Sequence, residues 1–217
     1  DMNSRDTLAT ELNVLETFNP VIPESYQDCS YLMLGNLAPA IQEQVINGMK
    51  DRPKLIAMDT MNFWMDIAMD GLKKTISMVD LLTINDEEAR QLSGEYSLLT
   101  AAQKIQEMGP KYLIIKKGEH GALLFHGKEM FYAPALLLPT VMDPTGAGDT
   151  FAGGFMGYLA STDDISFENM KRALVYGSAL ASFTVQKFGT DKIKEVTASE
   201  LEGRMDEFKS LMSFTHK

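Results

Sequence analysis

The sequence predicts an α/β fold with a mostly parallel sheet and helices on both faces. Short apolar segments with strand character alternate along the chain with longer segments whose apolar residues recur at helical spacing. This alternation is typical of βαβ units, which build parallel sheets. With 217 residues and 45% hydrophobic content, the chain can bury the core of one large domain.

Three apolar strands separated by helices are expected in the first half of the chain. The strands cover residues 31–35, 54–59 and 78–84, and the helices cover residues 39–49 and 62–74. In such sheets, ligands bind beyond the carboxyl ends of the strands. Polar residues follow these ends at Asn36, Asp59 and Asn85.

The second half continues the alternation. A helix over residues 101–108 leads to two apolar strands around residues 112–125, joined by a turn that holds Gly118 and Gly121.

Two local signals place the last helices. Ser166 is expected to cap a long, buried helix over residues 167–185. Thr197 and Glu200 have the spacing of a capping box, which predicts the start of a final helix.

The most informative stretch is a Gly-Ala-Gly turn that precedes a helix. The helix is indicated by Phe151, Phe155 and Leu159, which are spaced by four residues. The first amides of a helix have no partner within it and lie at the positive end of its dipole. The turn therefore predicts a site for a phosphate or a developing negative charge. Its residues are Gly146, Ala147 and Gly148.

Directly after this turn comes a carboxylate, Asp149, which would repel a bound phosphate. Two roles suit an acidic residue at this point. It caps the helix, or it takes the proton from the group that attacks the phosphate. The residues alone leave both roles open.

Two better-known phosphate loops do not fit the turn. The Rossmann fingerprint needs a third glycine three residues after the second, where this chain has Phe151. A P-loop needs Gly-Lys-Ser/Thr, and no such tripeptide occurs in the chain.

Composition favours small-molecule chemistry in the cytoplasm. The formal net charge of −10 argues against nucleic acid and anionic membranes as partners, since both attract basic surfaces. The single cysteine, Cys29, cannot form an intramolecular disulfide, which suits a reducing compartment. We expect neither a membrane span nor a signal peptide, because no apolar run is long enough and the first residues are polar.

Residues 143–154, Asp-Pro-Thr-Gly-Ala-Gly-Asp-Thr-Phe-Ala-Gly-Gly, closely resemble the second signature of the PfkB/ribokinase family of carbohydrate and nucleoside kinases. The resemblance implies a ribokinase-like fold and ATP-dependent phosphoryl transfer to a primary hydroxyl of a sugar or nucleoside. It also implies that Asp149 is the catalytic base and that the amides of residues 146–148 form the anion hole.

Asn85 and Glu88 match the family's Asn-X-X-Glu motif, whose residues act near the triphosphate and its Mg²⁺. Mg²⁺ keeps most of its waters and needs few carboxylates, so one glutamate suffices. The same spacing also fits a capping box between Asn85 and Glu88. The resemblance favours the role beside the metal.

The resemblance assigns further residues to ATP and to a monovalent cation. In the family, the turn at residues 116–121 follows the phosphates and ribose, and the residues after the long helix flank the adenine. Many relatives have Thr at the position of Lys116, and ribokinases often have Asn at the position of Ser178, so these contacts differ here. The residues assigned to the nucleotide are Lys116, Lys117, Gly118, Gly121, Ser178 and Gly189. Asp143 and Thr145 match ligands of K⁺ in members that use this ion.

Relatives open with a strand and an early Gly-Gly signature that contacts the sugar, and this chain has neither. We therefore expect that roughly the first third of a family-length protein is missing. Residues 1–16 are then a fragment of a small β lid, with a half-buried strand over residues 7–15, and residues 17–217 form the α/β core. An ordinary edge strand explains residues 7–15 equally well. Lid strands often form the family's dimer, so a homodimer through the lid is consistent with the resemblance.

Two other functions fit the same residues. A kinase of the hydroxymethylpyrimidine or pyridoxal type shares the fold, although the motifs beginning at Asn85 and Asp143 favour a sugar or nucleoside kinase. A nucleotide-binding regulatory protein would keep the site without turnover, and the intact Asp149 and Glu88 count against it.

Overall fold

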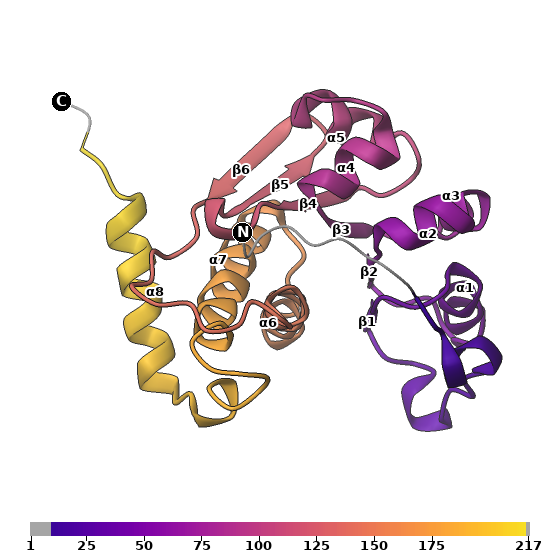
Figure 1. Cartoon of the computed structure of the whole chain (residues 1–217), viewed down its shortest axis with the longest axis horizontal. Coiled ribbons are helices and arrows are strands. Elements are labelled where there is room, and N and C mark those ends of the chain that lie inside the picture. Colours follow the sequence, from indigo (N-terminus) through magenta and orange to yellow (C-terminus); the bar gives the residue numbers. More distant parts are fainter. Residues whose placement is uncertain (1–9, 216–217) are drawn as a thin grey trace. The chain divides into compact units, whose positions relative to one another are not determined.

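The computed structural model describes residues 10–215, which fall into two compact units, Asp1–Tyr112 and Leu113–Lys217 (Figure 1). Strands and helices alternate over residues 31–116, which confirms the predicted α/β class. Each unit is described by itself below.

The N-terminal unit contains three parallel strands with helices between them. Strand β1 (Tyr31–Leu34) pairs with β2 (Leu55–Asp59), and β2 pairs with β3 (Leu81–Asn85). All five residues of β2 are buried, as expected for the middle strand of a parallel group. The helices of this unit are α1 (Pro39–Asn47), α2 (Asn62–Ile67), α3 (Met69–Ile76), α4 (Asp86–Ser93) and α5 (Leu98–Gln106).

The single helix predicted over residues 62–74 is in fact two helices, α2 and α3. The break lies at Ala68, whose backbone leaves the helical region (φ −143°, ψ 34°). Tertiary contacts orient the two pieces separately. The Trp64 indole N–H donates to Asn36 Oδ1 at 2.9 Å, and the Thr75 hydroxyl donates to the Pro39 carbonyl at 3.1 Å.

The strand predicted over residues 7–15 is not formed in its described part. Asn13–Thr17 is a short 3-10 helix, η1, and Val14 is 82% exposed. The backbone bonds locally instead, since Leu15 N donates to Leu12 O at 2.9 Å. Residues 1–9 lie outside the described residues, and the assignment of residues 1–16 to a lid stays a prediction.

The C-terminal unit combines strands with three helices. Strand β4 (Tyr112–Lys116) begins at the boundary of the units, and β5 (Ala122–His126) pairs with β6 (Glu129–Ala133) as an antiparallel hairpin. Strands β4 and β5 correspond to the two strands predicted around residues 112–125, and β6 was not predicted. The helices are α6 (Ala147–Thr162), α7 (Phe167–Thr184) and α8 (Ala198–Met212).

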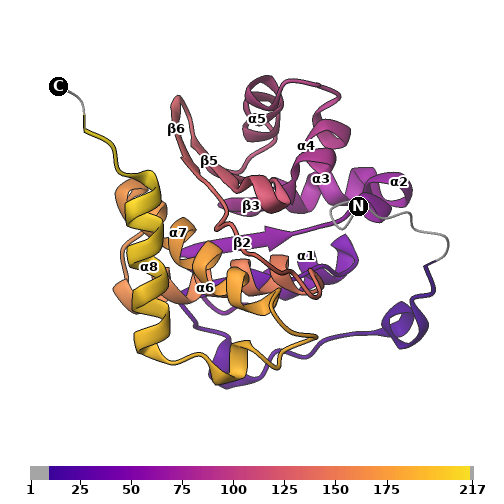
Figure 2. The same ribbon diagram turned by 60° about the vertical axis from the view of Figure 1, so that its left-hand side comes forward.

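Helices α6 and α7 pack side by side, and α8 lies along α7 (Figure 2). Glycines set the close approach of α6 and α7. A Cβ on Gly177 would lie 2.6 Å from the Phe151 carbonyl oxygen, and one on Gly154 would lie 2.7 Å from Leu180 Cδ1. The centre of α7 is buried, as its small apolar residues predict.

The predicted caps are also confirmed. Ser166 accepts a hydrogen bond from Asn169 N at the start of α7, and Thr197 and Glu200 form the capping box of α8.

Candidate active site

The candidate site is built on the segment that enters α6, here called the glycine loop (residues 142–150). Gly146 is the N-cap residue of α6 and has a left-handed backbone (φ 80°, ψ 0°), which side chains other than glycine rarely allow. Thr150 N donates to Gly146 O at 2.9 Å and closes the first turn of the helix. The glycine therefore lets the chain turn directly into the helix, so that the first amides of α6 face out of its N-terminus.

One amide of the predicted anion hole already has an acceptor. Ala147 N donates to the Pro144 carbonyl at 3.1 Å. A phosphate at this position would have to take the place of that turn bond. Within the turn, Gly146 and Gly148 are then the more direct amide donors to an anion.

Asp149 lies in the first turn of α6 and is exposed. The helix begins at Gly146 without a hydrogen bond from a capping side chain. Asp149 is thus not the N-cap residue of α6, and its role as a general base stays a prediction. An exposed carboxylate beside a helix N-terminus can reach the proton of a bound hydroxyl group, which is the first requirement for a general base.

Lys116 ends β4 beside the glycine loop. Its Nζ lies 3.5 Å from the position that a Cβ on Gly148 would occupy. The structure thus brings an ammonium group to the turn predicted to bind phosphate. A lysine ammonium at this place adds positive charge to that of the helix N-terminus.

The turn after β4 is shaped by packing within the chain. Lys117 N donates to Gly121 O at 2.8 Å, and Gly118 and Gly121 both have positive φ, 53° and 89°. A Cβ on Gly121 would lie 2.1 Å from the Ala133 carbonyl oxygen. The close approach of the end of β6 therefore requires glycine at position 121, even without a bound nucleotide.

Asp143, Thr145 and Gly189 are brought together at the start of the glycine loop. Thr145 N donates to Asp143 Oδ1 at 2.9 Å. Hydrogen bonds from the Thr145 amide and hydroxyl, with a smaller contribution from the Gly189 amide, hold the pKa of the Asp143 carboxyl below its ordinary value. The carboxylate is therefore ionised at neutral pH.

Ser178, predicted to face the adenine, lies half-buried in α7. Its hydroxyl donates to the Leu174 carbonyl at 3.0 Å. That bond turns the hydroxyl back onto its own helix.

Asn85 and Glu88 belong to the N-terminal unit, where they form the capping box of α4. Glu88 N donates to Asn85 Oδ1 and Asn85 N donates to Glu88 Oε2, both at 2.7 Å. Glu88 is only 4% exposed. The capping box that the spacing of Asn85 and Glu88 also fits is thus present, and a role beside Mg²⁺ stays a prediction. In the described part of the chain, no group of three or more His, Cys, Asp or Glu side chains is placed to hold a metal ion.

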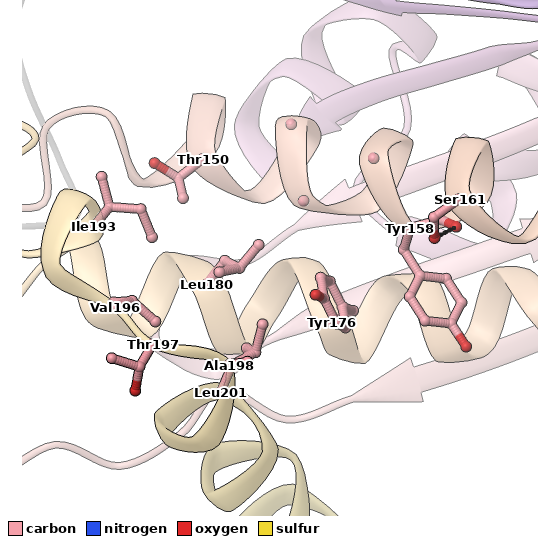
Figure 3. A pocket seen from close by; sticks show the side chains of 13 residues that line it. Thr150, Tyr158, Ser161, Tyr176, Leu180, Ile193, Val196, Thr197, Ala198 and Leu201 are labelled. Atoms are coloured by element: carbon pink, nitrogen blue, oxygen red, sulfur yellow. Dashed lines mark hydrogen bonds between the residues drawn. The ribbon is translucent and has the colours of Figure 1, made fainter.

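A cavity of about 510 Å³ opens between α6, α7 and the start of α8. Thr150, Ile193 and Val196 lie at one end, and Tyr158 and Ser161 at the other (Figure 3). The lining residues are uncharged: Thr150, Gly153, Gly154, Gly157, Tyr158, Ser161, Tyr176, Leu180, Ile193, Val196, Thr197, Ala198 and Leu201. Asp149 and the residues predicted to bind the nucleotide are not among them.

One contact of the glycine loop was not expected from the sequence. The Thr184 hydroxyl donates to Thr150 Oγ1 at 3.0 Å. The two threonines are 34 residues apart, so no local pattern could indicate the bond.

Comparison with family models matches residues 12–196 to the pfkB family of carbohydrate kinases. The chain belongs to this family. Within it, the cytidine kinase of Thermococcus kodakarensis is 29% identical over 154 residues, which cover 68% of this chain and 55% of that protein. The ribokinase of Staphylococcus aureus is 31% identical over 119 residues, which cover 52% of this chain and 38% of that protein.

Solved structures of pfkB-type kinases share the fold. A ribokinase from Thermotoga maritima has a TM-score of 0.64 at 27% identity, over 82% of this chain and 57% of that chain. A nucleoside kinase from Methanocaldococcus jannaschii has a TM-score of 0.71 at 19% identity, over 90% of this chain and 60% of that chain. The chain thus spans between 38% and 60% of the length of these relatives.

Proposed function

We propose that this chain carries the catalytic part of an ATP-dependent kinase that phosphorylates a primary hydroxyl of a sugar or nucleoside. The observation that carries the proposal is the arrangement at the start of α6. An exposed Asp149 directly follows a glycine-capped helix N-terminus, and the Lys116 ammonium lies beside Gly148. A base next to an anion site is what phosphoryl transfer to a hydroxyl requires. Membership of the pfkB family supports the same reading.

In the proposed reaction, Asp149 removes the proton of the acceptor hydroxyl as its oxygen attacks the γ-phosphorus of ATP. The new oxygen–phosphorus bond forms while the bond to the bridging oxygen of the β-phosphate breaks, and ADP leaves. The amides of Gly146 and Gly148 and the Lys116 ammonium stabilise the charge on the transferred group, and the Ala147 amide joins them once it gives up its turn bond to Pro144. Positioning and electrostatics supply most of the catalysis in such transfers.

ATP and Mg²⁺ are the proposed co-substrate and cofactor. When bound, Mg²⁺ would neutralise charge on the phosphates. A solved structure of a putative ribokinase II from E. coli contains both ATP and Mg²⁺. On the metal side we assign Glu88, and we assign Asn85 to the triphosphate beside it, because Mg²⁺ keeps most of its waters and needs few carboxylates. The residues assigned to the nucleotide are Lys116, Lys117, Gly118, Gly121, Ser178 and Gly189.

A monovalent cation is a finer part of the proposal. Asp143 and Thr145 are its assigned ligands, and the structure joins them through the hydrogen bond between Thr145 N and Asp143 Oδ1. The low pKa of Asp143 keeps its carboxylate charged, which suits K⁺.

The proposed acceptor is a small-molecule sugar or nucleoside, and the proposed location is the cytoplasm. The named relatives act on cytidine and ribose, according to their names, so both nucleosides and sugars belong in the test.

A homodimer through the lid is proposed as well. In the described residues, no helix is both long and apolar enough to span a membrane.

A panel assay tests the proposal. ADP release is measured with sugars, nucleosides and hydroxymethylpyrimidine as acceptors, alongside calorimetric titration with ATP and Mg²⁺. We expect ATP to bind and ADP to be released with at least one sugar or nucleoside. Release only with hydroxymethylpyrimidine would support the other kinase type of this fold. Binding without release, in a protein with its N-terminal part restored, would identify a regulatory nucleotide-binding protein.

A further inference from the structure

The end of α7 holds the glycine loop at both of its ends. Where the chain enters the loop, the Val185 carbonyl accepts hydrogen bonds from Met142 N at 2.8 Å and Asp143 N at 3.4 Å. Where the chain leaves the loop, the Thr184 hydroxyl donates to Thr150 Oγ1 at 3.0 Å. Two consecutive residues of one helix end thus bracket the segment that contains Asp149.

The Thr184 contact is fixed by its surroundings. Thr184 is only 2% exposed, so its hydroxyl lacks water as an alternative partner. Helix α7 is itself held close to α6 through the glycine contact between Gly177 and Phe151. The hydroxyl therefore presents a fixed donor to the side chain of Thr150.

Because Thr150 is held by Thr184, the adjacent Asp149 is held in place as well. Its amide closes the first turn of α6 onto Gly146, and it directly follows Asp149 in the chain. If Thr150 shifts, the first turn and the Asp149 carboxylate shift with it. A displacement of about 1 Å at a reacting group can reduce a rate by about a hundredfold.

We infer that Thr184 is a positioning residue, which acts through Thr150 to hold Asp149 and the amides of the glycine loop in place. The catalytic consequence rests on the proposed function. The effect on the loop itself does not, and it can be measured without turnover.

The test compares three variants of the full chain. Thr184→Val keeps the shape of the side chain and removes its donor, and Thr184→Ser keeps the donor. Ser182→Ala is the matched control. Ser182 is also buried in α7. Its hydroxyl donates to the Ala179 carbonyl and accepts from Arg204, so this variant loses a buried hydroxyl that bonds to α7 and α8.

Amide hydrogen exchange of peptides over residues 142–150 is the first readout. Loss of one hydrogen bond should make these amides exchange about fivefold faster in Thr184→Val. Thr184→Ser and Ser182→Ala should match the unchanged protein in this segment. If Thr184→Val does not fold, Thr150→Val removes the other partner of the same bond. Thr150 is half-exposed, so its substitution disturbs the core less, and it should give the same faster exchange.

Kinetics with ATP and the best acceptor are the second readout. Thr184→Val should lower kcat about tenfold or more with little change in the KM for ATP, and Thr184→Ser should restore kcat. Equal exchange in Thr184→Val and Ser182→Ala would overturn the inference, whether or not the chain is active. Faster exchange with an unchanged kcat would overturn its catalytic part. An unchanged protein that never releases ADP would instead count against the proposed function.

Discussion

Replacing Gly177 by alanine should push α6 and α7 apart. The added methyl group would lie 2.6 Å from the Phe151 carbonyl oxygen and 3.3 Å from Phe155 N. Both atoms belong to the backbone of α6, so no side-chain rotation can relieve the contact. The helix that carries Asp149 must move, or the methyl group must be compressed against it.

The sign of the stability change can be worked out from two opposing effects. Alanine within a helix is favoured over glycine by about 1 kcal/mol. Overpacking a close contact costs about 1 to 3 kcal/mol. The contact at 2.6 Å is with backbone, which favours the upper part of this cost, so we expect Gly177→Ala to lower the free energy of unfolding by up to about 2 kcal/mol.

Gly157→Ala provides the control within α6. A Cβ on Gly157 meets no atom within 4 Å, so only the helix preference acts and the variant should be slightly more stable than the unchanged protein. Thermal unfolding followed by circular dichroism measures both variants. For a chain of this size, 1 kcal/mol corresponds to about 2–4 °C in Tm. A rise in Tm for Gly177→Ala equal to that for Gly157→Ala would refute the packing argument.

Two further predictions concern charged groups. Hydrogen bonds from the Thr197 amide and, second, from the Lys192 ammonium lower the pKa of Glu200 from 4.5 to about 2. The ionised Glu200 therefore stabilises the fold fully above the unfolded pKa, and this stabilisation is lost as the pH falls towards 2. The Tm difference between the unchanged protein and Glu200→Gln should therefore shrink between about pH 5 and pH 3, and a constant difference would contradict the assignment. Lys116→Ala should weaken calorimetric ATP binding about tenfold, because an ammonium beside the glycine loop is lost. Lys128→Ala, in the exposed turn between β5 and β6, is the charge-matched control, and an equal effect of the two substitutions would contradict the role of Lys116.

Features set by neighbouring residues were predictable from the sequence. The alternation of strands and helices follows from apolar periodicity, and the caps at Ser166 and Thr197 follow from side-chain chemistry within one helical turn. The capping box of Asn85 and Glu88 has the same local origin. The glycine turn before α6 was recognisable because a left-handed backbone at Gly146 needs glycine.

Features set by distant contacts were not predictable. Trp64, four residues before the break at Ala68, bonds to Asn36, which lies 28 residues away in the chain, and no local pattern encodes that contact. The alternation over residues 7–15 resembles a strand, but its described part forms local 3-10 bonds instead. The bond between Thr184 and Thr150 likewise depends on the packing of α7 against α6.

Turnover by Asp149→Asn tests the central claim most directly. The substitution keeps the size of the side chain and removes its ability to accept a proton, and a general base contributes about a hundredfold to ten-thousandfold to rate. We predict that kcat falls at least about a hundredfold while the Kd for ATP changes little. Asp206→Asn, an exposed residue of α8, removes the same charge elsewhere and should leave both values unchanged. Near-normal turnover by Asp149→Asn would contradict the assignment of the base.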